Sequence, residues 1–154
     1  MENTVTTSAD ESTKRLLVAV DQLGPIWRER MGEHDKNSTF PYENLEEAKD
    51  AGLHRLTVPT EYGGFGYWLP GNFSGFYRIL ERIAYWDTNT AQLLQVHNHA
   101  AGIIGFHSSV AQRDMFLPEI VDGAFLASLG SEAHLYENGA EALASELTAV
   151  EGGY

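Results

Sequence analysis

Apolar side chains recur every three or four residues along most of the chain, which is the period of a helix that buries one face. The first such stripe consists of Leu16, Leu17, Val20, Leu23 and Trp27. It predicts a helix that Gly24 and Pro25 kink or divide. The preceding residues 1–13 carry almost no large apolar groups to offset the entropy of ordering, so they are predicted to form a disordered tail.

A second, short helix is predicted between Pro41, which suits a first helical turn, and Gly52, which suits a C-terminal cap. The glycine-rich segment that follows, residues 56–73, reads LTVPTEYGGFGYWLPGNF and mixes four glycines with five aromatic side chains. Glycine permits left-handed backbone angles and close approach of another group, so the segment predicts a tight irregular turn. Two interpretations stay open: a connection packed against its own domain, and a turn beside a ligand.

Three further helices are predicted downstream. The apolar face of the third consists of Phe73, Phe76, Tyr77, Leu80, Ile83 and Ala84. Asp87 and Thr88 can stop that helix and cap the fourth, which covers residues 89–106. The fifth helix is predicted to begin at Ser108 or Ser109.

Beyond residue 122 the pattern changes to alternating small or apolar and polar residues, which is typical of strands. Strands are predicted within residues 124–130 and 144–154. The sequence therefore indicates a mainly α protein with three parts: a disordered tail, an all-α N-terminal domain over residues 14–122, and the start of a truncated β domain over residues 123–154. Two isolated strands cannot bury a sheet face, which is why that last unit is expected to be incomplete.

Composition narrows the function. Twenty-two acidic and ten basic residues give a formal net charge of −12, which repels nucleic acid and anionic membrane surfaces. The absence of cysteine excludes a disulfide framework and thiol chemistry. The polar N-terminal stretch does not resemble a signal peptide, and no apolar run is long enough to span a bilayer. We therefore expect a cytoplasmic protein with neither nucleic acid nor membrane insertion among its partners.

Histidines form the densest set of titratable side chains. His97 and His99 lie two residues apart on a predicted helix, so they point to different faces and no metal site is expected. His97 is interpreted either as a hydrogen-bonded residue at a helix packing surface or as part of a ligand pocket. Phosphate-loop and dinucleotide-binding glycine motifs are absent from the sequence.

The order of several motifs resembles the N-terminal helical domain of the acyl-CoA dehydrogenase family. These motifs are FPYENLEEAKDAGL, then VPTEYGGFG, then LERIAYWDTNTA, and finally HSSVAQRDMFLPEIVDGAF. The resemblance covers about residues 14–132, with the strand-like tail following in the expected order. It implies an acyl-CoA dehydrogenase-like helical bundle followed by the first strands of an incomplete β-barrel, and a glycine-rich turn that lets the helical domain close over a flavin and substrate crevice.

The resemblance also implies FAD as cofactor, an acyl-CoA-like substrate whose hydride passes to the flavin, and a homo-oligomeric enzyme. The family's flavin-contacting motif at the start of the barrel matches LGSEAHLYENG, so Leu129, Ser131 and Glu132 are the candidate cofactor-binding residues. A hydroxyl and backbone N–H groups can hydrogen-bond the reactive edge of a flavin and stabilise charge on the reduced ring.

Two departures from the family pattern leave alternatives open. Ala133 replaces the proline of the motif, and no Gly-Ser-Asp follows it. This favours, as a first alternative, a flavin-dependent monooxygenase of the same superfamily that uses FAD or FMN, in which His97 or His99 would donate to a flavin peroxide. The family's catalytic base belongs to a C-terminal bundle beyond Tyr154, so the chain alone is expected to be inactive. A non-catalytic truncated paralogue that acts as an assembly partner is the second alternative.

Overall fold

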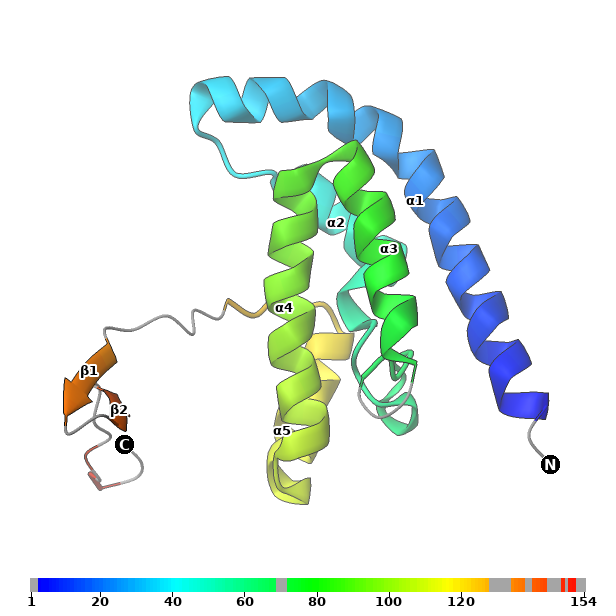
Figure 1. Ribbon diagram of the computed structural model, residues 1–154. Coiled ribbons are helices and arrows are strands. Elements are labelled where there is room, and N and C mark those ends of the chain that lie inside the picture. Colours follow the sequence, from blue (N-terminus) through cyan, green and yellow to red (C-terminus); the bar gives the residue numbers. More distant parts are fainter. Residues whose placement is uncertain are drawn as a thin grey trace.

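The computed structural model describes residues 3–68, 72–127, 134–137, 140–143, 148 and 150–151. Its helices and strands, in chain order, are α1 (Asn3–Asn37), α2 (Tyr42–Asp50), the 3-10 turns η1 (Leu53–Arg55) and η2 (Thr60–Tyr62), α3 (Phe73–Trp86), α4 (Thr88–His107), α5 (Val110–Val121), β1 (His134–Glu137) and β2 (Ala140–Leu143). The long helix α1 runs beside α3, and α3 and α4 form an antiparallel pair (Figure 1). The prediction of a mainly α protein with an N-terminal helical domain is confirmed.

Helix α1 begins at Asn3, so the stretch predicted to be a disordered tail over residues 1–13 is helical over its described part. Thr13 explains part of the difference, because it is 1% exposed and its hydroxyl lies 3.0 Å from the hydroxyl of Tyr67. The Lys14 ammonium also lies 3.0 Å from the Asp10 carboxylate one turn earlier. Such i,i+4 ion pairs favour the helix only slightly when both side chains are exposed to solvent. The contact with Tyr67 is long-range, which is why composition did not predict it.

The middle of α1 is shaped by Gly24 and Pro25. Pro25 lies inside the helix, which continues past it but bends strongly in its middle (Figure 1). Gly24 contacts the end of α3, since a side-chain carbon there would overlap the Trp86 indole. The Trp86 Nε1–H donates to the Asp21 carboxylate at 3.1 Å. The predicted kink therefore coincides with a close approach that wraps α1 around α3.

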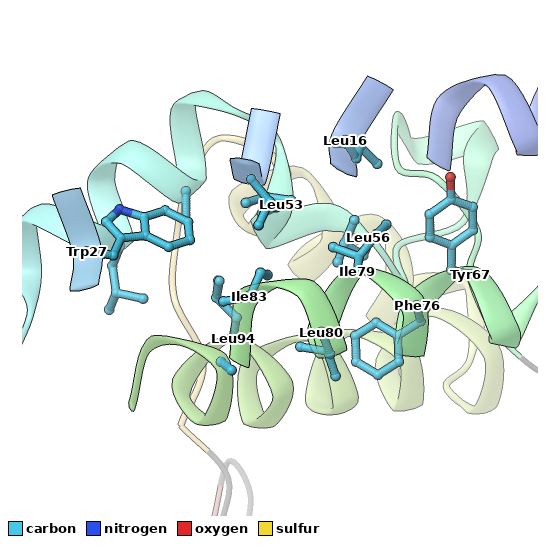
Figure 2. Close-up of a cluster of buried hydrophobic side chains, with 14 residues drawn as sticks. Leu16, Trp27, Leu53, Leu56, Tyr67, Phe76, Ile79, Leu80, Ile83 and Leu94 are labelled. Carbon is cyan, nitrogen blue, oxygen red and sulfur yellow. The ribbon is translucent and has the colours of Figure 1, made fainter. Parts of the chain in front are cut away.

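Helix α3 supplies the centre of the hydrophobic core. Phe76, Ile79 and Ile83 are at most 1% exposed, whereas Tyr77, which the prediction placed on the same face, is 54% exposed. Residue 77 is turned by about 100° from residue 76, away from the row that residues 76, 79, 80 and 83 form. Each fully buried aliphatic or aromatic side chain contributes about 1.5–3 kcal/mol. The cluster consists of Leu16, Val20, Trp27, Leu45, Ala48, Leu53, Leu56, Tyr67, Phe76, Ile79, Leu80, Ile83, Ala91 and Leu94 (Figure 2).

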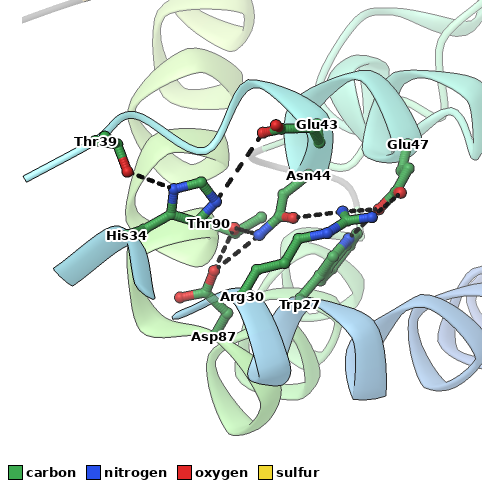
Figure 3. Close-up of polar contacts among 9 residues, drawn as sticks. All are labelled: Trp27, Arg30, His34, Thr39, Glu43, Asn44, Glu47, Asp87 and Thr90. Atoms are coloured by element: carbon green, nitrogen blue, oxygen red, sulfur yellow. Dashed lines mark hydrogen bonds and ion pairs between the residues drawn. The ribbon is translucent and has the colours of Figure 1, made fainter. Parts of the chain in front are cut away.

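A polar network ties α2 to the junction between α3 and α4 (Figure 3). Asn44 is 0% exposed, and its amide donates to Asp87 at 3.1 Å and to Thr90 at 3.0 Å. At the edge of the same network, Arg30 of α1 forms two hydrogen bonds of 3.0 Å with the Glu47 carboxylate. Two-pronged pairing of this kind fixes orientation as well as distance. The network thus holds α2 between α1 and α4.

The predicted helix ends are confirmed at three places. Gly52 adopts a left-handed conformation with φ of 80° and follows Ala51, the C-cap of α2. The Asp87 carboxylate accepts from the Asn89 N–H at 2.9 Å and caps α4. Ser109 and Gln112 form a reciprocal capping box at the start of α5.

After the helices, β1 and β2 form an antiparallel hairpin in which His134 pairs with Leu143 and Glu137 pairs with Ala140. These strands lie between the two stretches predicted to be strands, within residues 124–130 and 144–154. Residues 124–127 are not in a strand. The incomplete β-barrel stays a prediction, as do the domain boundaries.

Candidate functional site

The glycine-rich segment, described over residues 56–68, folds back on itself. The Gly66 N–H donates to the Val58 carbonyl at 2.8 Å, and Gly63 and Gly66 have φ of +92° and +64°. At Gly64 an added side-chain carbon would overlap the Val58 backbone. Side chains other than glycine rarely adopt these angles or tolerate this approach, so the glycines are required by the turn itself.

The bulky groups of this segment pack against its own domain. Trp68 is 7% exposed and covers Gly102 of α4, where a side-chain carbon would overlap the indole. Pro59 covers Gly105 in the same way, with 2.6 Å between its Cδ and the position of an added side-chain carbon. The two glycines form a flat strip on α4 that receives the loop. Of the two interpretations left open, packing against the same domain is observed, and closure over a flavin stays a prediction.

Asn98 of α4 supplies hydrogen bonds to the irregular backbone before the loop. Its side-chain oxygen accepts from the Leu56 N–H at 2.9 Å, and its amide donates to the Leu53 carbonyl at 2.9 Å. The Thr57 hydroxyl donates to the Asn98 carbonyl. All four residues are 0% exposed. Buried irregular backbone needs such partners, so Asn98 fixes the start of the glycine-rich segment on α4.

His97, beside Asn98, connects three segments of the chain. Its Nε2 lies 2.6 Å from the His54 carbonyl oxygen in η1, and its Nδ1 lies 2.9 Å from the backbone nitrogen of Leu126. A carbonyl oxygen only accepts and an amide N–H only donates, so the ring carries its proton on Nε2 and offers the Nδ1 lone pair to Leu126. His97 therefore joins α4 to η1 and to residues 122–127, which we call the exit segment.

The surroundings of His97 keep the ring neutral. The side chain is 0% exposed, and burial lowers the pKa of His97 from its ordinary value of 6.5 to about 4. The hydrogen bond to the His54 carbonyl offsets part of this decrease. Both ring nitrogens are engaged, which leaves neither to donate to a flavin peroxide. This geometry is that of a hydrogen-bonded histidine at a packing surface, the first of the two interpretations of the sequence.

Phe125 fills the space beside the two imidazoles. Its ring centroid lies 4.8 Å from that of His97 and 6.4 Å from that of His54. The His54 Nε2 donates to the carbonyl of Val121, the last residue of α5, at 3.1 Å. Burial lowers the pKa of His54, and the Val121 hydrogen bond opposes the shift. Two histidines thus hold the end of α5 and the exit segment on the helical domain.

His99 and His107 lie elsewhere, around Trp68. The ring centroid of His99 is 5.5 Å from the indole, and the Trp68 Nε1–H donates to the His107 Nε2 at 3.4 Å. His99 is exposed and so differs from His97 in access to solvent. In the parts of the chain that the structure describes, no group of three or more His, Asp or Glu side chains is placed to hold a metal ion.

The candidate cofactor-binding residues Leu129, Ser131 and Glu132 lie outside the described residues. What the structure places is the backbone that leads to them, held at Leu126. Sequence reasoning singled out His97 but missed Asn98 and Leu126. An asparagine on the apolar face of a predicted helix is a signal that could have indicated Asn98. In contrast, nothing in the local pattern marks the amide of Leu126 as a partner of His97.

The helical domain is similar in sequence to known dehydrogenases. Residues 22–124 match the family described as "Acyl-CoA dehydrogenase, N-terminal domain", which is more than half of the chain. The mitochondrial isobutyryl-CoA dehydrogenase of Dictyostelium discoideum is 32% identical over 95 residues, which are 61% of this chain and 22% of that protein. The Bacillus subtilis (strain 168) protein named "Putative acyl-CoA dehydrogenase YdbM" is 26% identical over 129 residues, which are 80% of this chain and 32% of that protein. No solved structure matches.

The match over residues 22–124 assigns this helical domain to the N-terminal domains of a class of dehydrogenases. The chain belongs to the acyl-CoA dehydrogenase family. Its matches span less than a third of the length of the two relatives, so the residues described here correspond to one part of such a protein.

Proposed function

We propose that this chain is the N-terminal portion of a flavin-dependent oxidoreductase that oxidises an acyl-CoA-like substrate with hydride transfer to FAD. The observation that carries the proposal is the family match over residues 22–124, which ends within the exit segment. The candidate flavin-contacting residues Leu129, Ser131 and Glu132 follow directly in the sequence. We further propose a homo-oligomeric enzyme, as the family resemblance implies, and a cytoplasmic location stays a prediction.

Phe125 covers the two imidazoles, and both nitrogens of His97 are engaged. The groups proposed to hold FAD are those that follow the exit segment in the sequence. When bound, the flavin supplies the hydride acceptor, and the part played by the described residues is to hold the chain that leads to it.

A branched, short acyl-CoA is the first substrate to test, because one relative is named an isobutyryl-CoA dehydrogenase. The experiment uses the complete protein encoded by the reading frame that contains this chain, reconstituted with FAD under anaerobic conditions. Addition of isobutyryl-CoA is expected to bleach the visible absorbance of oxidised flavin. Isobutyrate with free coenzyme A serves as the control, since it supplies the same groups without the thioester.

The absence of bleaching with isobutyryl-CoA and with longer acyl-CoA thioesters would contradict the proposal. Product formation that requires oxygen and externally reduced flavin would instead indicate the monooxygenase alternative, for which the exposed His99 is a candidate donor. Failure to bind any flavin, together with stable association with another subunit, would indicate the assembly partner.

Among the described helices, none has the length and apolar character of a bilayer span.

A further inference from the structure

Two arginines lie over one phenyl ring of the glycine-rich segment. The guanidinium carbon of Arg15, in α1, lies 6.0 Å from the centroid of the Phe65 ring. The guanidinium carbon of Arg55, in η1, lies 5.8 Å from the same centroid. Two separate elements of the fold therefore bring their positive charges to one ring, and we call Arg15, Arg55 and Phe65 the arginine cluster.

The ring of the arginine cluster is fixed by contacts on several sides. The Phe65 N–H donates to the Arg55 carbonyl at 3.1 Å, which keeps these two residues side by side. A side-chain carbon added at Gly52 would lie 3.5 Å from the Arg55 Nε and 3.6 Å from the Phe65 ring, so both side chains pack against this glycine. Phe65 also stacks on Tyr67, whose hydroxyl lies 3.0 Å from that of Thr13 in α1. These contacts hold α1 and η1 on either flank of the glycine-rich segment.

Neither arginine of the cluster forms an ion pair within the part of the chain that the structure describes. Arg15 is exposed, and the Arg55 Nε is buried without a hydrogen-bond partner. Acidic residues outnumber basic ones by 22 to 10, so a shortage of carboxylates does not explain this. Each remaining arginine meets a carboxylate or a backbone carbonyl: Arg30 with Glu47, Arg78 with Asp10, Arg82 with Asp21, Arg28 with the Tyr85 carbonyl, and Arg113 with the Gly105 carbonyl.

The charges of the arginine cluster favour an anion as its ligand. Two like charges held near one ring repel each other, and an anion that contacts both relieves the repulsion. A guanidinium over an aromatic ring keeps its planar fork of N–H donors, which matches two oxygens of a carboxylate or a phosphate. One arginine neutralises a carboxylate, whereas a phosphate monoester carries up to two negative charges and has oxygens for both arginines. The cluster therefore fits a phosphate monoester better than a carboxylate.

We propose that Arg15, Arg55 and Phe65 form a binding site for the phosphate monoester group of a small organic phosphate. The two arginines donate charge-assisted hydrogen bonds to the phosphate, and the ring holds them in place for it. The net charge of −12 repels anions at a distance, so the affinity depends on this local pair. The site is independent of the proposed function, because it includes no flavin-contacting residue.

Calorimetric titration of the complete protein with inorganic phosphate, at constant ionic strength, tests the site. We expect Arg15→Gln and Arg55→Gln each to bind phosphate roughly tenfold more weakly, which is the effect of one charge-assisted hydrogen bond. Arg82→Gln is the matched control, because it removes the same charge from an arginine that is already paired with Asp21 at 2.6 Å. The control is expected to bind phosphate as the unaltered protein does.

Three results would overturn the proposal: no phosphate binding by the unaltered protein, unchanged binding in Arg15→Gln, or an equal loss in Arg82→Gln. The last result would show that only the total charge matters. Arg55 is half-buried, and its substitution by glutamine can disturb folding. Arg15 is exposed, so Arg15→Gln keeps the test decisive in that case.

Coenzyme A and dephospho-coenzyme A distinguish two sources of the phosphate, since they differ only in the phosphate monoester on the ribose. If removal of this group weakens binding to the unaltered protein but not to Arg15→Gln, the site takes the phosphate of a coenzyme A compound. If the two compounds bind alike, the site takes another organic phosphate, and the titration with inorganic phosphate still supports it. Failure of the proposed function is recognised separately, because an absence of flavin bleaching by acyl-CoA leaves the phosphate titration unaffected.

Discussion

Replacing Asn98 by alanine tests whether α4 holds the glycine-rich segment in place. The substitution removes the acceptor of the Leu56 N–H and a donor to the Leu53 carbonyl, both at 2.9 Å. These backbone groups lie in residues that are 0% exposed, so water cannot replace the lost partner without opening the core. Asn98 also donates to the Leu94 carbonyl one turn earlier, but that oxygen belongs to the helix ladder and is not counted.

The magnitude follows from the two buried backbone groups. Leaving a buried donor or acceptor without its partner costs about 1–3 kcal/mol each. Alanine is the better helix former and returns roughly 0.5 kcal/mol. The expected net loss is about 2–5 kcal/mol of the free energy of unfolding, a large share of the roughly 5–15 kcal/mol typical of a folded domain. For a chain of this size the midpoint of thermal unfolding should fall on the order of 10 °C.

Urea denaturation followed by far-UV circular dichroism measures this loss. Asn89→Ala is the matched control, because it is the same substitution in the same helix at a residue whose side chain is exposed. We expect that control to stay within about 0.5 kcal/mol of the unaltered protein. If Asn98→Ala costs no more than Asn89→Ala, the glycine-rich segment does not depend on α4 for its backbone partners, and the argument built on Asn98 is wrong.

Three further predictions follow from single residues. Ser38 has φ of 52° just after α1, so Ser38→Gly should raise the free energy of unfolding by roughly 0.5–1 kcal/mol, and no gain in a urea titration would contradict this reason. Gly102→Ala should lower stability by about 1–3 kcal/mol because the added carbon overlaps Trp68, whereas Gly32→Ala, which meets nothing within 4 Å, should be neutral or stabilising; equal midpoints would refute the overlap. The folded-state pKa of His97 is about 4, below the ordinary 6.5, so the unfolded chain takes up the proton first as the pH falls. The stability that depends on a neutral ring is therefore fully present above pH 6.5 and is lost as the pH falls towards 4. The loss should reach on the order of 2 kcal/mol at pH 5, measured as the difference between the free energies of unfolding at pH 7 and pH 5, and it should be absent in His97→Asn; identical pH profiles of the two proteins would contradict it.

Local signals predicted most of the helical part of the fold. The period of apolar residues placed α1 and α3, and Gly52, Asp87 and Ser109 marked the ends of helices because each acts through backbone groups within a few positions of itself. The start of α1 was predicted wrongly because the contact that buries Thr13 joins it to Tyr67, 54 residues away. Composition of a short stretch carries no information about such a partner.

The candidate site was predictable only in part for the same reason. The string HNHAAG drew attention to His97. Its spacing of two residues from His99 predicted, from helix geometry alone, that the two histidines would not share a metal. Its actual partners, the His54 carbonyl and the Leu126 amide, are backbone groups 43 and 29 residues away. Backbone groups are identical in every residue, so no pattern of side chains identifies which of them will meet a given histidine.

Two buried polar residues of α4, His97 and Asn98, are polar for the same physical reason. Thr90, His97 and Asn98 are 0% exposed, and two of them bond to backbone in η1, at the start of the glycine-rich segment or in the exit segment. Irregular backbone cannot satisfy its own N–H and C=O groups as a helix does, so a buried irregular segment needs side chains from elsewhere. An apolar residue at position 97 or 98 would pack as well but would leave those groups unpaired. α4 is therefore polar at His97 and Asn98 because these side chains hold irregular segments at fixed positions. One of these segments leads in the sequence to the proposed flavin-contacting residues.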